Sequence, residues 1–152
     1  MEVKDIVKEA ITVSEEASFR EALSAMVNGQ TNTLLVTNEE GSLVGEVTVA
    51  DLLDAIVPEY LDGDSIAANF ATEEMFQEAV KDAEEQQVQY FMSTDFSTVE
   101  MDDGLMSIAA TAIAHKRARI PVVDKDNRPV GIISRRGLKK ILAKFLNVKD
   151  SA

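Results

Sequence analysis

The sequence predicts a mixed α/β fold built from two similar halves, and three observations support this prediction. The first is a duplication, because moving the sequence by 86 positions aligns Thr12, Val13, Val36, Val44, Gly45 and Leu52 with Thr98, Val99, Val122, Val130, Gly131 and Leu138. The second is that each copy shows the same order of apolar patterns: strand, helix, strand, strand and helix. The third is that 152 residues, 45% of them hydrophobic, suffice for two small halves sharing a core. A duplication of this size indicates two subdomains that bury a face against each other and carry two related sites.

The first copy carries clear boundary signals for its elements. Ser18, followed by Glu21 three residues later, is the signature of a capping box and predicts where a helix begins. Apolar residues then recur at helical spacing until Gly29, which we expect to end the helix. The elements expected in this copy are a short strand at 11–13, that helix, strands at 33–37 and 43–47 joined by a turn, and a helix from about 49 to 60.

The second copy repeats this order. Asp102 or Asp103 is expected to cap its first helix, and Pro121 stands at the start of a strand, where no ladder N–H is needed. The elements expected here are a short strand at 97–99, a helix that carries Leu105 to Ile113, strands at 120–123 and 130–133, and a helix from about 135 to 146.

Residues 62–92 are not repeated. Thr72 can cap a helix there, because apolar residues from Met75 to Ala83 recur at helical spacing. We interpret this stretch as an inserted helical segment packed beside the repeats, with a mobile connector as the alternative. The domain organisation expected is a first motif at 1–61, the inserted helical segment or linker at 62–92, a second motif at 93–148 and a disordered tail at 149–152.

Composition and charge exclude several classes of protein. The net charge of −12 argues against nucleic acid as a partner, because neutralisation of phosphates dominates such binding. The chain has no Cys and one His, His115, so a disulfide or the usual zinc site is not expected within it. There is no apolar run of about 18 residues and no secretory signal, so we expect a cytoplasmic protein without a membrane partner. His115 is interpreted as a helix-end or site-rim residue.

The charges are unevenly placed along the chain. Residues 59–85 hold nine acidic residues and one Lys, whereas residues 135–147 hold five basic residues and no acidic one. One interpretation is two solvated helix faces. The other is a pair of complementary faces in a dimer, or a local anion site within an acidic protein.

The first copy has Gly45-Glu46-Val47-Thr48-Val49-Ala50-Asp51, and the second has Arg119-Ile120-Pro121-Val122-Val123-Asp124 and Val130-Gly131-Ile132-Ile133-Ser134. These stretches resemble the cystathionine-β-synthase (CBS) domain, which pairs in tandem as a Bateman module. The resemblance implies two pseudo-symmetric β-α-β-β-α motifs packed through their sheets. It also implies a cleft between them that binds an adenosyl compound (AMP, ADP, ATP or S-adenosylmethionine), and a homodimer formed through the helices.

The resemblance assigns roles to a Gly-x-x-Thr/Ser-x-x-Asp motif at the start of a helix. In the family the hydroxyl contacts a phosphate or ribose, and the Asp holds the ribose hydroxyls. Thr48 and Asp51 match this motif, and a helix N-terminus suits a phosphate because its N–H groups are unpaired. The same two residues also match a plain capping box, so this alternative stays open.

The second copy departs from the motif. Ser134 keeps the hydroxyl, but Gly137 stands where Asp is expected, and Arg135 and Arg136 occupy the first turn of the helix. Cations there oppose the helix dipole unless an anion binds. Arg119 matches a family position that contacts phosphate. Alternatively, these side chains offset the acidity of the chain or pair with the acidic insert.

The resemblance also suggests where an adenine would lie. The residues concerned are on the short opening strands and the first hairpin strand, and they are Ile11, Thr12, Phe96, Thr98, Ile120 and Pro121. Ile11, Ile120 and Pro121 can instead be plain core residues. The function expected is a regulatory, ligand-sensing module, and the alternative is an interaction or scaffold module that has lost ligand binding. An enzyme is not expected, because no nucleophile and base set, metal cluster or P-loop is recognisable.

Overall fold

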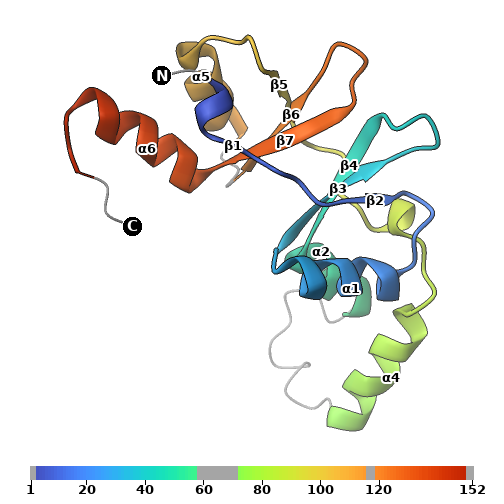
Figure 1. The fold of residues 1–152 in the computed structure, drawn as a ribbon. Coiled ribbons are helices and arrows are strands. Elements are labelled where there is room, and N and C mark those ends of the chain that lie inside the picture. The colour runs from blue at the N-terminus through green and yellow to red at the C-terminus, as the bar shows by residue number, and fades with distance from the viewer. Residues whose placement is uncertain (1–2, 58–71, 116–118, 150–152) are drawn as a thin grey trace. The chain divides into compact units, whose positions relative to one another are not determined.

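The computed structural model describes residues 3–57, 72–115 and 119–149. These residues fall into two compact units that are described separately (Figure 1). Unit 1 comprises residues 1–10, 41–43 and 95–152, and unit 2 comprises residues 11–40 and 44–94.

Each unit is a small sheet with helices. The elements assigned mainly to unit 2 are β2 (Thr12–Ser14), α1 (Phe19–Gly29), β3 (Thr33–Thr37), β4 (Leu43–Thr48), α2 (Val49–Ile56), α4 (Glu73–Ala83) and the 3-10 helix η3 (Val88–Tyr90). The elements of unit 1 are the 3-10 helix η1 (Val3–Asp5), β1 (Val7–Lys8), β5 (Val99–Glu100), α5 (Leu105–His115), β6 (Arg119–Val123), β7 (Pro129–Ser134) and α6 (Arg135–Phe145). The mixed α/β class and the order of elements in both copies are confirmed.

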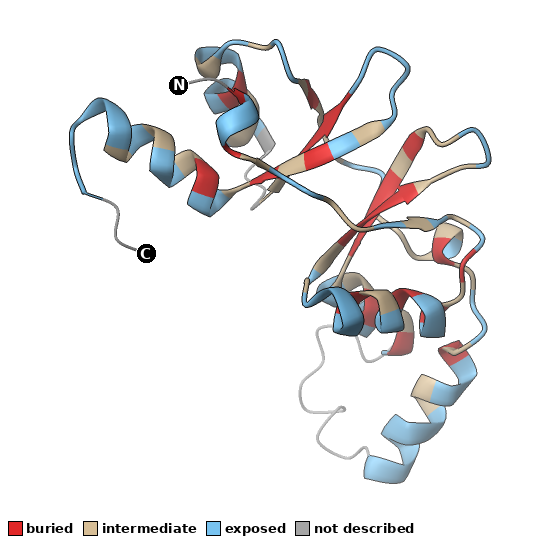
Figure 2. Cartoon of the chain, viewed as in Figure 1, coloured by how far each residue is buried: buried red, intermediate tan, exposed pale blue. Residues whose placement is uncertain are grey.

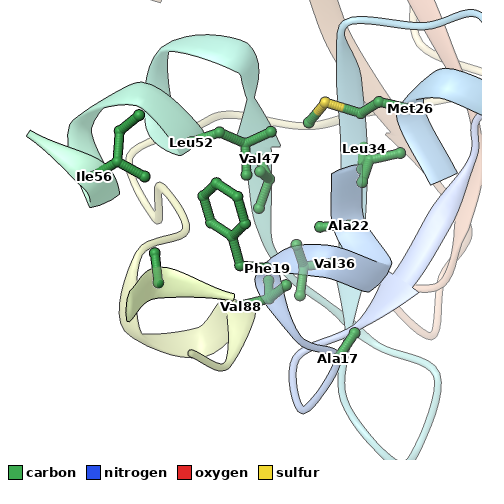
Figure 3. Close-up of a cluster of buried hydrophobic side chains, with 11 residues drawn as sticks. Ala17, Phe19, Ala22, Met26, Leu34, Val36, Val47, Leu52, Ile56 and Val88 are labelled. Carbon is green, nitrogen blue, oxygen red and sulfur yellow. The ribbon is translucent and has the colours of Figure 1, made fainter. Parts of the chain in front are cut away.

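In unit 2 the strand order is β2-β3-β4, and β2 runs parallel to β3, with Val13 opposite Val36. Helices α1 and α2 lie against this sheet, and their apolar sides meet it in one buried cluster (Figure 3). The ring of Phe19 lies in this cluster with Val47 and Leu52, and it meets Phe91 edge to face at 5.8 Å between centroids. Apolar burial and an aromatic pair of about 0.5–1.5 kcal/mol therefore tie the first turn of α1 to residues after η3.

The two ends of α1 can be compared with the helix boundaries that the sequence predicts. Ser18 accepts a hydrogen bond from the N–H of Glu21 at 3.1 Å, and the Glu21 carboxylate accepts one from the N–H of Ser18, so the predicted capping box is present. Gly29 is the last helical residue, but the left-handed residue that ends the helix is Gln30, with φ of 51°. Gly29 also lies close to Ile11, because a Cβ there would lie 2.0 Å from Ile11 Cδ1, the flexible end of that side chain.

In unit 1 the strand order is β1-β7-β6-β5, with β1 and β6 antiparallel to β7 and β5 parallel to β6. The buried cluster of this unit combines Val3 and Ile6 from the N-terminal segment with five apolar residues of the second copy: Val99, Ile108, Ile120, Val122 and Ile133. Pro121 has no backbone N–H to donate, and it lies in β6 one residue before Val122, which pairs with Val99 of β5. Its missing N–H therefore falls outside the described pairing of β5 with β6.

The two copies exchange their opening segments. Val7 of the first copy pairs with Ile133 of the second, whereas Ser93 bridges to Glu46 of the first copy. A glycine allows each approach: a Cβ at Gly131 would lie 2.6 Å from the carbonyl oxygen of Lys8, and one at Gly45 would lie 3.0 Å from that of Ser93. The compact units therefore do not follow the segments 1–61, 62–92 and 93–148, which stay a prediction about the repeats.

Some boundaries differ from expectation. Helix α5 begins at Leu105, so neither Asp102 nor Asp103 directly precedes it, and the Asp103 carboxylate accepts instead from the N–H of Glu100 at 2.9 Å. Helix α2 ends at Ile56, and positions 58–60 of the expected helix lie outside the described residues, as do 150–152 of the expected tail. The predicted helix after Thr72 is present as α4, and Thr72 accepts from the N–H of Met75 at 3.2 Å.

Candidate functional site

In unit 2, Thr48 and Asp51 stand where β4 passes into α2. Thr48 is extended, with φ of −113° and ψ of 170°, and its Oγ1 accepts from the N–H of Asp51 at 3.4 Å. Asp51 Oδ2 accepts from the Thr48 N–H at 2.8 Å and from the Thr48 hydroxyl at 3.2 Å. Both residues are half-buried, and together they form a complete capping box. The capping interpretation of this motif is therefore confirmed, and it leaves a ligand role untested.

In unit 1, Ser134 caps α6 in the same way, accepting from the N–H of Gly137 at 3.3 Å. Gly137 is buried, and a Cβ there would lie 3.2 Å from the carbonyl oxygen of Ile6 and 3.3 Å from its Cβ. The exchanged N-terminal segment thus lies against the first turn of α6 at the position where the first copy has Asp51. This contact gives a physical reason for the departure from the motif.

The predicted basic residues of the second copy gather at the end of the β6–β7 pair. Arg119 is opposite Ser134 in the strand register, and Arg135 and Arg136 form the first two positions of α6. Arg119 is half-buried, whereas Arg135 and Arg136 are exposed. Figure 2 shows that most of α6 is exposed or of intermediate burial. Three positive charges and a capping hydroxyl therefore belong to one strand-to-helix junction.

A hollow of about 300 Å³ lies beside this junction within unit 1. Its lining residues are Asp5, Ile6, Val7, Lys8, Arg136, Gly137 and Lys140. Lys140 follows Arg136 by four residues on α6, so both side chains lie on one face of the helix. Three cationic residues and one acidic residue line the hollow, which suits an anion. Arg119, Ser134 and Arg135 are not among its lining residues.

The sequence analysis missed three of these residues, Asp5, Lys8 and Lys140. Asp5 and Lys8 belong to the first copy, and the exchange of opening segments places them against the helix of the second. The spacing of Arg136 and Lys140 along one helix was a signal that pointed to Lys140.

The residues proposed for adenine binding lie in different environments. Thr12 is exposed on β2 of unit 2, opposite Leu35. Phe96 and Thr98 are half-buried before β5, and Ile120 and Pro121 are buried in β6 of unit 1. Ile120 is a member of the apolar core of that unit, so the core interpretation holds for it.

A carboxylate cluster lies just before α5. Oxygen atoms of Glu100, Asp102 and Asp103 lie within 4.8 Å of one another, in exposed or half-buried positions. The Asp103 carboxylate accepts a hydrogen bond from the N–H of Glu100, and this bond within the turn explains the position of the carboxylate. Among the helices of the described residues, none is both long and apolar enough to cross a membrane.

Two small α/β units, each with a hydroxyl-capped helix after its hairpin, define a tandem pair of repeated modules. The family model described as "CBS domain" matches residues 3–58 and 84–144. The chain belongs to the CBS domain family and contains two CBS domains in tandem. The second match begins at residue 84, within the segment 62–92 that the sequence analysis kept apart.

Two curated proteins are similar in sequence to most of this chain. An uncharacterized protein of Methanocaldococcus jannaschii, MJ1426, is 26% identical over 93% of this chain and 91% of its own length. Homoserine O-acetyltransferase of Methanococcoides burtonii is 27% identical, but the chain spans only 24% of its length.

Solved structures show the same fold. A CBS domain-containing protein of unknown function from Kribbella flavida has a TM-score of 0.78 at 18% identity, over 94% of this chain and 99% of that one. The CBS-pair protein CBSX2 from Arabidopsis thaliana has a TM-score of 0.73 at 23% identity, over 96% of each chain. The CBS domain pair of protein MJ0100, in complex with 5′-methylthioadenosine and S-adenosylmethionine, has a TM-score of 0.68 at 23% identity, over 95% and 98%.

Proposed function

We propose that this chain is a regulatory module that senses an adenosyl compound with an anionic tail, such as AMP, ADP or ATP. The observation that carries the proposal is the hollow beside α6, which Lys8, Arg136 and Lys140 line together. Support for an adenosyl ligand comes from the CBS pair of MJ0100, whose structure holds two adenosyl compounds. We also propose that the chain acts in the cytoplasm as a homodimer and catalyses no reaction.

The electrostatics of α6 favour an anion at its N-terminus. Arg135 and Arg136 stand where the helix dipole is positive, which costs a few tenths of a kcal/mol for each cation. A phosphate would accept charge-assisted hydrogen bonds from the Arg136 side chain, which lines the hollow, and hydrogen bonds from unpaired N–H groups of the first turn. The unfavourable arrangement in the free protein then becomes a favourable one in the complex.

In the first copy we propose that Thr48 and Asp51 hold a ribose. Asp51 Oδ2 is occupied by the two hydrogen bonds from Thr48. Its other oxygen, Oδ1, to which none of the described residues donates, is an acceptor for a ribose hydroxyl. The cap fixes the carboxylate in place, so little side-chain entropy would be lost on binding.

The candidate ligands differ in charge, so we expect them to differ in affinity for the hollow. S-adenosylmethionine carries a positive sulfonium, which the three cationic residues of the hollow repel, whereas a nucleotide carries only negative charge on its tail. We therefore expect affinity to fall from ATP and ADP to AMP, and to be weaker for S-adenosylmethionine and adenosine.

Isothermal titration of the five compounds against three proteins tests this proposal: the wild type, Arg136→Ala, and Arg128→Ala as a control. Arg128 is an exposed cation on the turn between β6 and β7 and does not line the hollow. Losing a charge-assisted contact of about 1.5–3 kcal/mol weakens ATP binding roughly tenfold to a hundredfold in Arg136→Ala. Arg128→Ala should bind ATP within about twofold of the wild type, and adenosine binding should be unchanged in all three. Absence of binding by all five compounds near millimolar concentration would refute the proposal.

A second function, an interaction or scaffold module without a ligand, is favoured by the burial of Gly137 under Ile6 and by the complete cap at Thr48. It predicts that Thr48→Ala and Asp51→Ala lower the free energy of unfolding by about 1 kcal/mol each and do nothing else. Urea unfolding and ATP titration of the same two variants distinguish the functions, because the sensing module also loses affinity for ATP.

A further inference from the structure

Helices α1 and α4 of unit 2 are joined at one corner. The N–H of Phe19 donates to the carbonyl oxygen of Gln86 at 2.8 Å, and the N–H of Arg20 donates to that of Glu84 at 3.2 Å. The Arg20 guanidinium also pairs with the Glu84 carboxylate, whose hydrogen bond raises the pKa of the guanidinium. From this corner α4 extends away from α1 (Figure 1). The first turn of α1 therefore holds one end of α4, and the two helices diverge toward the other.

A hollow of about 520 Å³ lies between the two helices, and α4 belongs to neither of the segments that match the CBS domain model. Its apolar lining is Phe19 and Leu23 from α1, with Phe76 and Val80 from α4, and we call it the α1–α4 groove. Each pair is spaced four residues apart, so it lies along one face of its helix. Leu23 is 43% exposed and Phe76 is 55% exposed. Two large, exposed apolar side chains around one hollow indicate an interaction surface.

The groove belongs to the acidic unit of the chain. Unit 2 holds 17 acidic and 2 basic residues, whereas unit 1 holds 10 acidic and 13 basic residues. Helices α1 and α4, with the two residues that follow α4, hold seven acidic residues and two basic ones, Arg20 and Lys81. Glu84 pairs with Arg20, and Glu73 lies four residues before Gln77, which lines the groove. A segment that carries cations around an apolar face is therefore attracted to the groove, and an acidic one is repelled.

The walls of the groove also select the conformation of what it binds. Both walls are α-helices, whose interior N–H and C=O groups are already paired within each helix. An extended segment would find no strand edge here for its own backbone groups, whereas a helix pairs these groups internally.

From these observations we propose that the α1–α4 groove binds an amphipathic, cationic helix of a partner protein. Apolar side chains of that helix, spaced three and four residues apart, lie between Leu23 and Phe76. Its Lys or Arg side chains lie beside the carboxylates of α4. The groove is formed within unit 2, whereas the anion hollow is formed within unit 1, so this inference goes beyond the sensing function.

A synthetic helical peptide tests the proposal. The probe is a fluorescent peptide of Leu and Lys, about 16 residues or four turns long, with Leu at helical spacing. Its control is a scrambled peptide of the same composition, which has the same charge but no apolar face. Fluorescence anisotropy should give the wild type a dissociation constant at least about tenfold lower for the helical peptide than for the scrambled one.

Matched variants locate the binding site. Leu23→Gln and Phe76→Gln should each raise the dissociation constant of the helical peptide about tenfold, because each removes an apolar contact. Leu53→Gln is the control, since Leu53 on α2 is 50% exposed and does not line the groove, and it should change the constant by less than twofold. Circular dichroism checks that each variant is folded.

Two outcomes of these titrations overturn the proposal. Equal affinity for the helical and scrambled peptides would show only a general attraction of cations to an acidic protein. Equal constants for Leu23→Gln and Leu53→Gln would place the peptide elsewhere. ATP titration of the same variants should match the wild type, so the outcome for the groove is separate from that for the sensing function.

Cysteine labelling shows whether the groove is open in the free protein, because the chain has no native Cys. Leu23→Cys should react with a water-soluble maleimide as fast as Leu53→Cys, and the helical peptide should slow only Leu23→Cys. Slow labelling of Leu23→Cys at every protein concentration would show that the chain covers its own groove. Slow labelling only at high concentration would show that a second copy covers it, and either result overturns the proposal.

Discussion

Glycine residues, which carry a hydrogen atom in place of a side chain, allow the exchanged segments to approach their partner strands closely. At Gly131 an added Cβ would meet Val7 Cγ1 at 2.4 Å and the carbonyl oxygen of Lys8 at 2.6 Å. The second of these atoms belongs to the backbone of β1 and cannot rotate away. A methyl group at position 131 would therefore push β1 off β7.

Gly131→Ala should accordingly lower the free energy of unfolding by about 2–3 kcal/mol, within the range for overpacking of a filled site. Gly104→Ala is the control, because nothing lies within 4 Å of a Cβ at that position, and its cost should stay below about 1 kcal/mol. Urea unfolding followed by circular dichroism measures both values. Equal values for the two variants would show that β1 is not held against β7.

Several residues with local partners were predictable from the sequence, although Asp103, which bonds Glu100 and does not cap α5, was not, and residues with distant partners were not. The caps at Ser18, Thr48, Thr72 and Ser134 each depend on an N–H three positions later, so the local sequence contains both partners of the interaction. Gly137 is close to the backbone of Ile6, which lies far from it in the sequence. A glycine indicates either a backbone that needs conformational freedom or the close approach of another segment, and the sequence alone does not say which.

At the scale of elements, α6 shows an arrangement that local rules disfavour. Its first turn carries Arg135 and Arg136, at the positive end of the helix dipole, and its last turn carries Lys144, at the negative end. Arg135 and Arg136 should thus destabilise the free protein, whereas Lys144 should stabilise it.

Arg135→Gln is expected to raise the free energy of unfolding by about 0.3–1 kcal/mol at low ionic strength, and Lys144→Gln to lower it by a similar amount. The two variants change the net charge equally, so each controls for the other. Chemical unfolding in 10 mM and 1 M salt measures the effect, and the difference should shrink at high salt. Shifts of the same sign would attribute the effect to net charge and not to the dipole.

The elements themselves followed from periodicity, turn residues and the duplication, which is why the order of strands and helices was predicted. The pairing of β1 with β7 was not, because a strand of two residues has no period to detect. The same pairing brings Lys8 to the hollow beside α6, so the candidate site was predicted only for residues within the second copy.

At the scale of the whole molecule, the exchange of opening segments means that neither unit corresponds to one half of the sequence. The core of unit 2 includes Ala83 and Val88, which a fragment ending at residue 61 lacks. All members of that core lie between residues 17 and 88.

A fragment of residues 11–94 should therefore unfold cooperatively on heating, and a fragment of residues 1–61 should not. Circular dichroism at increasing temperature makes the comparison, with the full chain as the reference. A cooperative transition in the shorter fragment would contradict the assignment of Ala83 and Val88 to the first core.

The pairing of β1 with β7 also sets an order of events during synthesis. Residues 7 and 8 leave the ribosome well before their partner strand, which begins at residue 129. At about 5–20 residues per second, this first strand waits roughly 6–24 seconds for its neighbour. Its length of two residues and the charges of Lys8 and Glu9 leave little edge on which a foreign strand could settle in the meantime.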